Sequence, residues 1–215
     1  QDMVQGNPVS IVSKLLPKQP SKSQRVQHHP ALPWRQLPAF YANQLAEIKS
    51  TTKALLMFVI LTGARSGEAR QAEWKEVDLT AQVWTVPATR MKTGRLHRVP
   101  LSENAIGLLE EQKNRSKGPL IFPAPRGGIL TDMALTSFLR QNNVPSDVPG
   151  RVATAHGFRS SFRDWASEAG YARDLAERAL AHIINNQSEA AYHRTDLLEQ
   201  RREMMEAWAK FVFGQ

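Results

Sequence analysis

The 215-residue sequence contains no cysteine. This absence excludes a disulfide framework, thiolate zinc sites and a cysteine nucleophile, and it is compatible with a reducing compartment. Long apolar runs are also missing. The longest, residues 54–61, is far shorter than the roughly 20 residues that a membrane-spanning helix needs. We therefore expect a cytoplasmic protein that does not enter a membrane.

Acidic residues are the next deficit, with 20 Asp and Glu against 28 Lys and Arg and a net charge of +8. The apolar share of 41% is ordinary for a globular protein, so the charge is the unusual property. A basic surface can serve solubility alone, but it also favours a polyanionic partner. Nucleic acid is favoured over a membrane, because the sequence shows no basic amphipathic helix or lipidation signal.

The first 33 residues lack a regular pattern and are rich in Pro, Ser, Gln and Lys. They are predicted to form a basic linker together with the tail of a preceding domain, and residues 34–215 to form one folded domain. The chain begins with Gln1 rather than Met, so we expect it to be part of a longer protein. Adjacent His28 and His29 point in different directions and have no carboxylate nearby, which argues against a metal site there.

The hydrophobic pattern predicts a mainly helical domain with a small antiparallel sheet, an α+β class. A helix over residues 54–61 is expected to be buried on all sides and to end at Gly63. Ser66 is a plausible N-cap of a further helix running to about Trp74, which would place Arg65 at the junction of the two. The pattern then changes to strands, with a hairpin whose turn region, residues 91–95, carries Lys92. Residues 120–122 are predicted to form a short strand.

Residues 155–165 are predicted to open a buried helix, because Phe158, Phe162 and Trp165 share one face. His156 and Arg159 lie three residues apart at its start. A helix N-terminus with unpaired N–H groups, together with a guanidinium, suits a phosphate. For an isolated motif of this kind a polar first turn is the simpler interpretation, so the phosphate hypothesis depends on the rest of the chain.

Three features complete the pattern towards the C-terminus. We expect His182 to follow directly a short helix over residues 173–180. Tyr192 lies ten residues later, on another predicted short helix that is flanked by helix-breaking residues. A final amphipathic helix over residues 197–213 is expected to pack on its own core, with exchange onto a neighbouring protomer as the alternative.

This order of residues resembles the catalytic domain of the tyrosine recombinases, and most of all prophage and genomic-island integrases. The resemblance extends from about Trp34 to the C-terminus, with Ala181 where many members have Gly. It is carried by Leu-Thr-Gly-Ala-Arg-Ser-Gly-Glu at 61–68, Met-Lys-Thr-Gly at 91–94, Arg-Val-Pro-Leu-Ser at 98–102, His-Gly-Phe-Arg at 156–159, Ala-Leu-Ala-His at 179–182 and Ala-Ala-Tyr at 190–192.

The resemblance implies a site-specific recombinase that cleaves and rejoins DNA through a 3′-phosphotyrosyl intermediate, with no metal, ATP or other cofactor. Tyr192 would be the nucleophile, and Arg65 and Arg159 would clamp the non-bridging phosphate oxygens. Lys92 would protonate the leaving 5′-oxygen. His156 would act as an acid/base partner, and His182 would hydrogen-bond a non-bridging oxygen. Glu68 would orient Arg65 from behind, or would merely complement the helix dipole.

The implied partners are double-stranded DNA attachment sites, a tetramer on paired sites, and accessory DNA-bending or directionality proteins, in a bacterial cytoplasm near the nucleoid. Further basic residues are expected to include contacts to the phosphate backbone. They are Arg90, Arg95, Arg98, Arg126, Arg140, Arg151 and Arg163.

Three other functions compete with this interpretation. A DNA-binding module without catalysis would not need Tyr192 or the residues expected around it. A type IB topoisomerase-like enzyme shares the chemistry but fits the spacing less well. A metal-dependent nuclease would need a convergent cluster of Asp and Glu residues, which the sequence does not offer.

Overall fold

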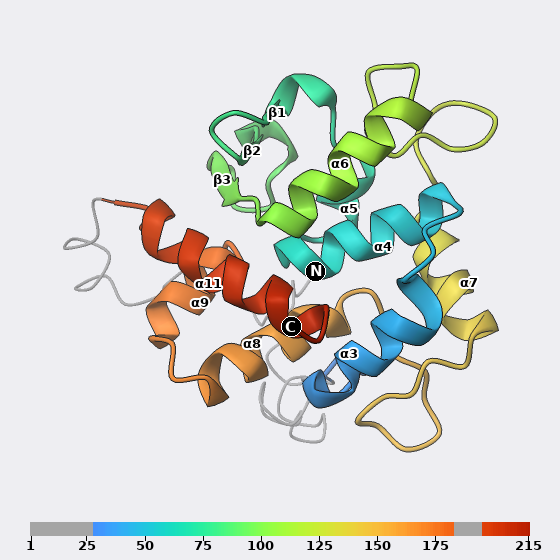
Figure 1. Cartoon of the computed structure of the whole chain (residues 1–215), viewed down its shortest axis with the longest axis vertical. Helices are drawn as coiled ribbons and strands as arrows, with labels where there is room; N and C mark the ends of the chain where they lie inside the picture. Colours follow the sequence, from blue (N-terminus) through green and yellow to red (C-terminus); the bar gives the residue numbers. More distant parts are fainter. Residues whose placement is uncertain (1–27, 183–194) are drawn as a thin grey trace, which may run out of the picture.

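The structure, a computed structural model, describes residues 28–182 and 195–215 (Figure 1). Its centre is helix α4, Thr51–Thr62, in which every residue from Ala54 to Thr62 is buried. The Ser50 hydroxyl caps this helix by accepting the N–H of Lys53 at 3.3 Å. Figure 1 shows α4 surrounded by the other helices, so the predicted all-round burial is confirmed.

The surrounding helical segments are short, and most of them present one apolar face to α4 or to its neighbours. They are η1 Trp34–Gln36, α3 Leu37–Phe40, η2 Tyr41–Leu45, α5 Ser66–Arg70, η3 Trp74–Glu76, η4 Ala88–Arg90, α6 Glu103–Arg115, α7 Met133–Gln141, α8 Gly157–Glu168, α9 Arg173–Ala179 and α11 Leu198–Val212.

A three-stranded antiparallel sheet flanks this helical body in the order β1-β2-β3, with β1 Val77–Asp78, β2 Val83–Val86 and β3 His97–Pro100. The predicted hairpin corresponds to β2 and β3, paired Val83 to Pro100 and Val86 to His97. Residues 120–122 do not form the predicted strand, because only a single bridge, Leu120 to Glu73, pairs them. The mainly helical class with a small antiparallel sheet is confirmed.

Helix α11 packs on the chain's own core, as the sequence interpretation favoured. Met204, Met205 and Trp208 are buried, and the Trp208 indole donates to the carbonyl of Ile60 on α4 at 2.8 Å. Across residues 28–182 and 195–215, no helix has the length and apolar character needed to cross a membrane.

Residues 30–33 also belong to the packed body. The carbonyl of Pro30 accepts the N–H of Thr154 at 2.9 Å, and the carbonyl of Leu32 accepts the hydroxyl of Ser161 on α8. Gly157, the first residue of α8, lies so close that a Cβ there would be 2.0 Å from the Pro30 carbonyl oxygen. Residues 30–33 are therefore fixed against α8.

Candidate active site

Arg65 lies where the sequence predicts it, at the junction of α4 and α5. Gly63 ends α4 in the left-handed conformation at φ 62°, which a residue without a Cβ adopts easily. The predicted cap is wrong by one residue, because Arg65 rather than Ser66 is the N-cap, and α5 ends at Arg70 instead of near Trp74.

Glu68 fixes the orientation of Arg65. One carboxylate oxygen accepts the backbone N–H of Arg65 at 3.0 Å, and the other accepts its guanidinium Nη1 at 2.9 Å. Glu68 is buried, whereas the Arg65 side chain keeps 22% of its surface exposed. Since a buried carboxylate needs its partners, the pair holds Arg65 rigidly with part of the guanidinium free.

Lys92 lies in the β-turn Met91–Gly94, which is closed by a 2.9 Å hydrogen bond from the N–H of Gly94 to the carbonyl of Met91. Met91 is buried and Lys92 is exposed, so the chain turns outward at the lysine. A lysine at such a place can reach a ligand while its backbone stays attached to the core.

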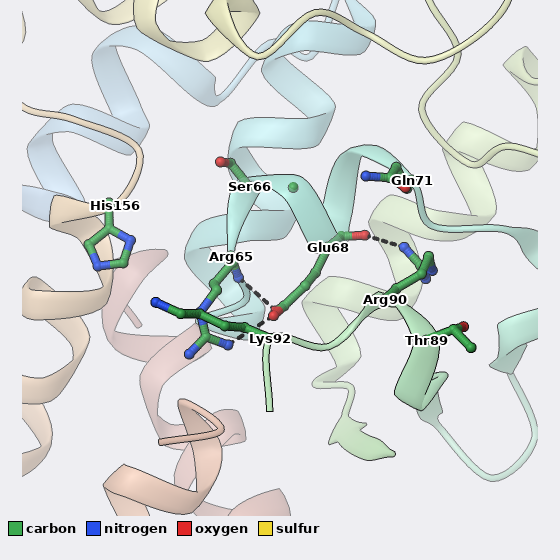
Figure 2. Close-up of a pocket in the computed structure, with 9 residues that line it drawn as sticks. Arg65, Ser66, Glu68, Gln71, Thr89, Arg90, Lys92 and His156 are labelled. Carbon is green, nitrogen blue, oxygen red and sulfur yellow. Dashed lines mark hydrogen bonds and ion pairs between the residues drawn. The ribbon is translucent and has the colours of Figure 1, made fainter. Parts of the chain in front are cut away.

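These residues meet in one open cleft of about 520 Å³. Figure 2 shows the Lys92 side chain crossing the cleft near Arg65 and Glu68, with its amine on the side where His156 lies. The lining residues are Arg65, Ser66, Gly67, Glu68, Gln71, Thr89, Arg90, Lys92 and His156. The cleft thus collects cationic and imidazole side chains from three separate parts of the chain.

His156 is the residue that precedes α8, and its ring packs against His29 with 4.4 Å between the ring centroids. Partial burial lowers the pKa of His156 to about 4, and Arg159, His29 and Arg65 reinforce the shift. At neutral pH the imidazole is therefore uncharged and able to accept a proton.

Arg159 lies beneath the cleft rather than in it. Its guanidinium donates to the carbonyl of Gly63, to the carbonyl of Leu180 at 2.7 Å, and to His182 Nε2 at 3.0 Å. Burial lowers its pKa to about 10, with nearby Arg65 as the second cause. Arg159 therefore ties the end of α4 to the end of α9.

The expected row of unpaired N–H groups at the start of α8 is partly occupied. The N–H of Gly157 donates to Thr154, and the N–H of Arg159 donates to the carbonyl of His156 at 3.1 Å. Fewer N–H groups than expected are therefore free at this helix end.

His182 is connected to this group through Arg159 and through Glu177. Its Nδ1 faces the Glu177 carboxylate, which also accepts Arg163 Nε at 2.7 Å. This pairing makes Nδ1 the donor, so Nε2 of the neutral ring is the acceptor that receives the Arg159 N–H. Burial lowers the pKa of His182, and Arg159 and Arg65 act in the same direction.

Tyr192 lies outside the described residues. The other two tyrosines pack internally, with ring contacts from Tyr41 to Phe213 and from Tyr171 to Trp165.

Sequence reasoning missed several residues around the cleft. His29 had no detectable signal, since its partner His156 is remote in sequence. Glu177 and His97 are revealed only by tertiary contacts. Burial is the main cause that lowers the pKa of His97 to about 4, followed by Arg201, while its hydrogen bond to the backbone of Ala179 opposes the shift.

The basic residues expected to contact DNA divide into two groups. Arg90, Arg98 and Arg163 are paired internally with Glu76, Asp196 and Glu177. Exposed side chains without an ion pair to another described residue are those of Arg95, Arg126, Arg140 and Arg151. Arg98 is exposed as well, in spite of its ion pair. Among the residues that the structure describes, no group of three or more His, Asp or Glu side chains could hold a metal ion.

Both the sequence and the fold of this chain are similar to those of known proteins. A model of the phage integrase family matches residues 32–197. Prophage integrase IntA of Escherichia coli (strain K12) is 38% identical over 181 residues, which are 82% of this chain and 43% of that protein. The chain spans about half the length of the curated relatives that it matches over most of its own length.

Several solved structures share the fold, among them two that are bound to DNA. The Tn1549 transposon integrase in complex with transposon right end DNA has a TM-score of 0.61 at 17% identity, over 97% of this chain and 73% of that chain. A lambda integrase dimer bound to a COC′ core site has a TM-score of 0.55 at 20% identity, over 82% and 63%. The family model covers most of the sequence, and the chain therefore belongs to the phage integrase family.

Proposed function

We propose that the chain is the catalytic part of a site-specific tyrosine recombinase that integrates and excises a mobile element. The observation that carries the proposal is the convergence of Arg65, Lys92 and His156 on one open cleft, with Arg159 directly behind it. Residues 34–215 would form the catalytic domain. The contacts of residues 30–33 support a boundary with the linker slightly before residue 34.

The proposed reaction is a transesterification. The phenol oxygen of Tyr192 forms a bond to phosphorus, the bond from phosphorus to the 5′-oxygen breaks, and the DNA 3′-end remains as a phosphotyrosyl ester. The phenol proton passes to neutral His156, and Lys92 protonates the leaving oxygen. The reverse reaction with another 5′-hydroxyl rejoins the strands, so no external energy source is consumed.

Two arginines supply the electrostatic stabilisation. The exposed part of the Arg65 guanidinium can reach a non-bridging oxygen on which charge develops in the transition state, and such contacts are each worth about 3 kcal/mol. Arg159 already donates to two carbonyls and to His182. We propose that a bound phosphate accepts N–H groups from Arg159 and from a protonated His182, replacing the contact between the two side chains.

The proposed partner is double-stranded attachment-site DNA. The net charge of +8 and the exposed arginines support it, as do the DNA complexes of fold relatives. We further propose that the protein self-associates on paired sites and acts with accessory DNA-bending or directionality proteins. Its location would be the bacterial cytoplasm, near the nucleoid. Of these further points, only self-association has support among the fold relatives, from the lambda integrase dimer.

The test is covalent trapping. The chain, alone and within its complete reading frame, is incubated without metal with nicked duplexes of randomised core sequence, and adducts are separated on a denaturing gel. We expect an adduct that Tyr192→Phe abolishes, while Tyr41→Phe and Tyr171→Phe retain it, because those rings pack internally. DNA binding without any adduct in either form of the protein would instead support the non-catalytic binding module.

A further inference from the structure

The turn that carries Lys92 is held by an arginine that the proposed mechanism leaves unused. Arg90 is the last residue of η4 and lies two residues before Lys92. Its guanidinium Nη1 donates to the main-chain carbonyl of Glu68 at 2.8 Å, and Nη2 pairs with the carboxylate of Glu76. Figure 2 shows Arg90 directed at the backbone of Glu68, on the opposite side of Glu68 from Arg65.

Both acceptors of Arg90 are firmly placed. Glu68 is the residue that orients Arg65. The Glu76 side chain is only 7% exposed, and its Oε2 also accepts the N–H of Glu73 at 3.2 Å and the indole of the fully buried Trp84 at 3.1 Å. Arg90 thus joins η4, which leads to Lys92, to helix α5, which carries Glu68, and to η3, which carries Glu76.

Arg90 is poorly placed to hold DNA itself. Its side chain is 17% exposed, two of its nitrogens are engaged with Glu68 and Glu76, and its Nε is buried. Lys92, in contrast, follows buried Met91 and is exposed. The chain is therefore fixed at residues 90–91 and becomes free at the lysine.

We propose that Arg90 is a positioning residue that sets the distance between Lys92 and Arg65, so that the lysine amine meets the leaving oxygen of the phosphate that Arg65 binds. This inference rests on the proposed recombinase function. A displacement of about 1 Å in a reacting group can cost about 100-fold in rate, so the loss of such a brace should be visible in the protonation step.

The experiment uses two forms of one nicked duplex, chosen from the randomised pool by adduct formation. In one form the scissile bond has its normal 5′-bridging oxygen, and in the other that oxygen is replaced by sulfur. A thiol has a pKa of about 8.5, against about 15.7 for water, so a 5′-thiolate leaves without a proton from Lys92. The sulfur substrate therefore reports every step except leaving-group protonation.

Arg90→Lys keeps the charge but loses the planar fork that reaches two acceptors. We expect adduct formation at saturating DNA to slow 10- to 100-fold on the oxygen substrate and to stay within about threefold of the unmodified protein on the sulfur substrate. The Kd for DNA should change less than twofold. Lys92→Ala should show the same rescue by sulfur, whereas Arg65→Lys should be slow on both substrates.

Arg70→Lys is the matched control, because Arg70 lies on the same helix α5 and donates to a main-chain carbonyl, that of Leu130, away from the turn. It should react within about twofold of the unmodified protein on both substrates. Glu76→Gln removes the charge that pairs with Arg90 and keeps one side-chain oxygen that can accept the N–H of Glu73 and the indole of Trp84. It replaces Arg90→Lys if the latter does not fold, as judged by its melting curve.

Each result decides the matter. Slowing on oxygen with rescue on sulfur supports the proposal. Equal slowing on both substrates, or no slowing on oxygen, overturns it. If the unmodified protein forms no adduct with any duplex of the randomised pool, either alone or within its complete reading frame, the recombinase function itself is refuted, which is a separate outcome.

Discussion

At the scale of single residues, the carboxylate of Glu68 serves two N–H groups of Arg65, one on the backbone and one on the guanidinium. In Glu68→Gln the amide keeps one oxygen and turns an NH2 group towards the other donor. We expect adduct formation to fall at least 10-fold, because Arg65 loses its fixed orientation.

The readout for Glu68→Gln is the single-turnover rate on both substrates described above. Sulfur should not restore it, since the defect lies at Arg65 and not at the leaving group. Glu199→Gln, which removes an exposed carboxylate of α11 that pairs with Arg202, is the control and should react normally. Rescue by sulfur would show that Glu68 acts through Lys92 instead.

The sequence was sufficient to locate Arg65, Lys92 and His156, because each sits at a local signal: a helix stop, a hairpin turn and a helix start. It was not sufficient for the partners that orient them. Arg90 contacts the Glu68 carbonyl across 22 residues, and nothing in the local pattern distinguishes it from a surface arginine. Arg159 was expected at the phosphate, yet its donors reach two backbone carbonyls that only the tertiary fold brings near.

At the scale of elements, strong periodic signals predicted α4, the hairpin and α11, whereas short or irregular elements were missed. Strand β1 has two residues and no pattern long enough to detect. Residues 30–33 resemble a linker in composition, but the main-chain carbonyls of Pro30 and Leu32 accept hydrogen bonds from Thr154 and Ser161, which composition does not reveal.

The contact of residues 30–31 with α8 gives a prediction for Gly157→Ala. The added Cβ would lie 2.0 Å from the Pro30 carbonyl oxygen and 2.7 Å from the Ala31 Cα, so backbone must move. We expect the free energy of unfolding in urea to fall by about 1–3 kcal/mol, with loss of the His29 contact to His156.

Gly107→Ala is the matched control for Gly157→Ala. Gly107 lies inside α6 with no neighbour within 4 Å of an added Cβ. An alanine there should raise the free energy of unfolding by about 0.5–1 kcal/mol, because helical glycine is costly in backbone entropy. A Gly157→Ala protein as stable as the unmodified one would show that residues 30–31 are not held against α8.

At the scale of the whole molecule, the positive charges around the cleft repel one another in the absence of DNA, and the protonation states of nearby histidines respond to this repulsion. Burial is the main cause that lowers the pKa values of His97, His156 and His182, and neighbouring arginines reinforce it. Three imidazoles near Arg65 and Arg159 are therefore kept neutral in the folded protein. The fold tolerates two close arginines partly because these neighbours add no further charge.

This arrangement makes stability depend on pH. An unfolded histidine has a pKa near 6.5, whereas that of His97 is about 4 in the folded protein. Between these values the unfolded chain binds a proton that the folded chain does not, so acidification favours unfolding. The stabilisation is complete above about pH 6.5 and is lost as the pH falls towards 4. We expect the melting temperature to decrease steadily from pH 7 to pH 5.

Replacing His97 with glutamine should flatten that decrease. A glutamine can hydrogen-bond the backbone of Ala179 but does not titrate, so about 2 kcal/mol of the change between pH 7 and pH 5 should disappear, equivalent to about 4–8 °C. Calorimetric melting curves of the two proteins across this range measure the difference. Parallel curves would mean that His97 is protonated as readily in the folded protein as in the unfolded chain, and that the acid sensitivity arises from His156 and His182.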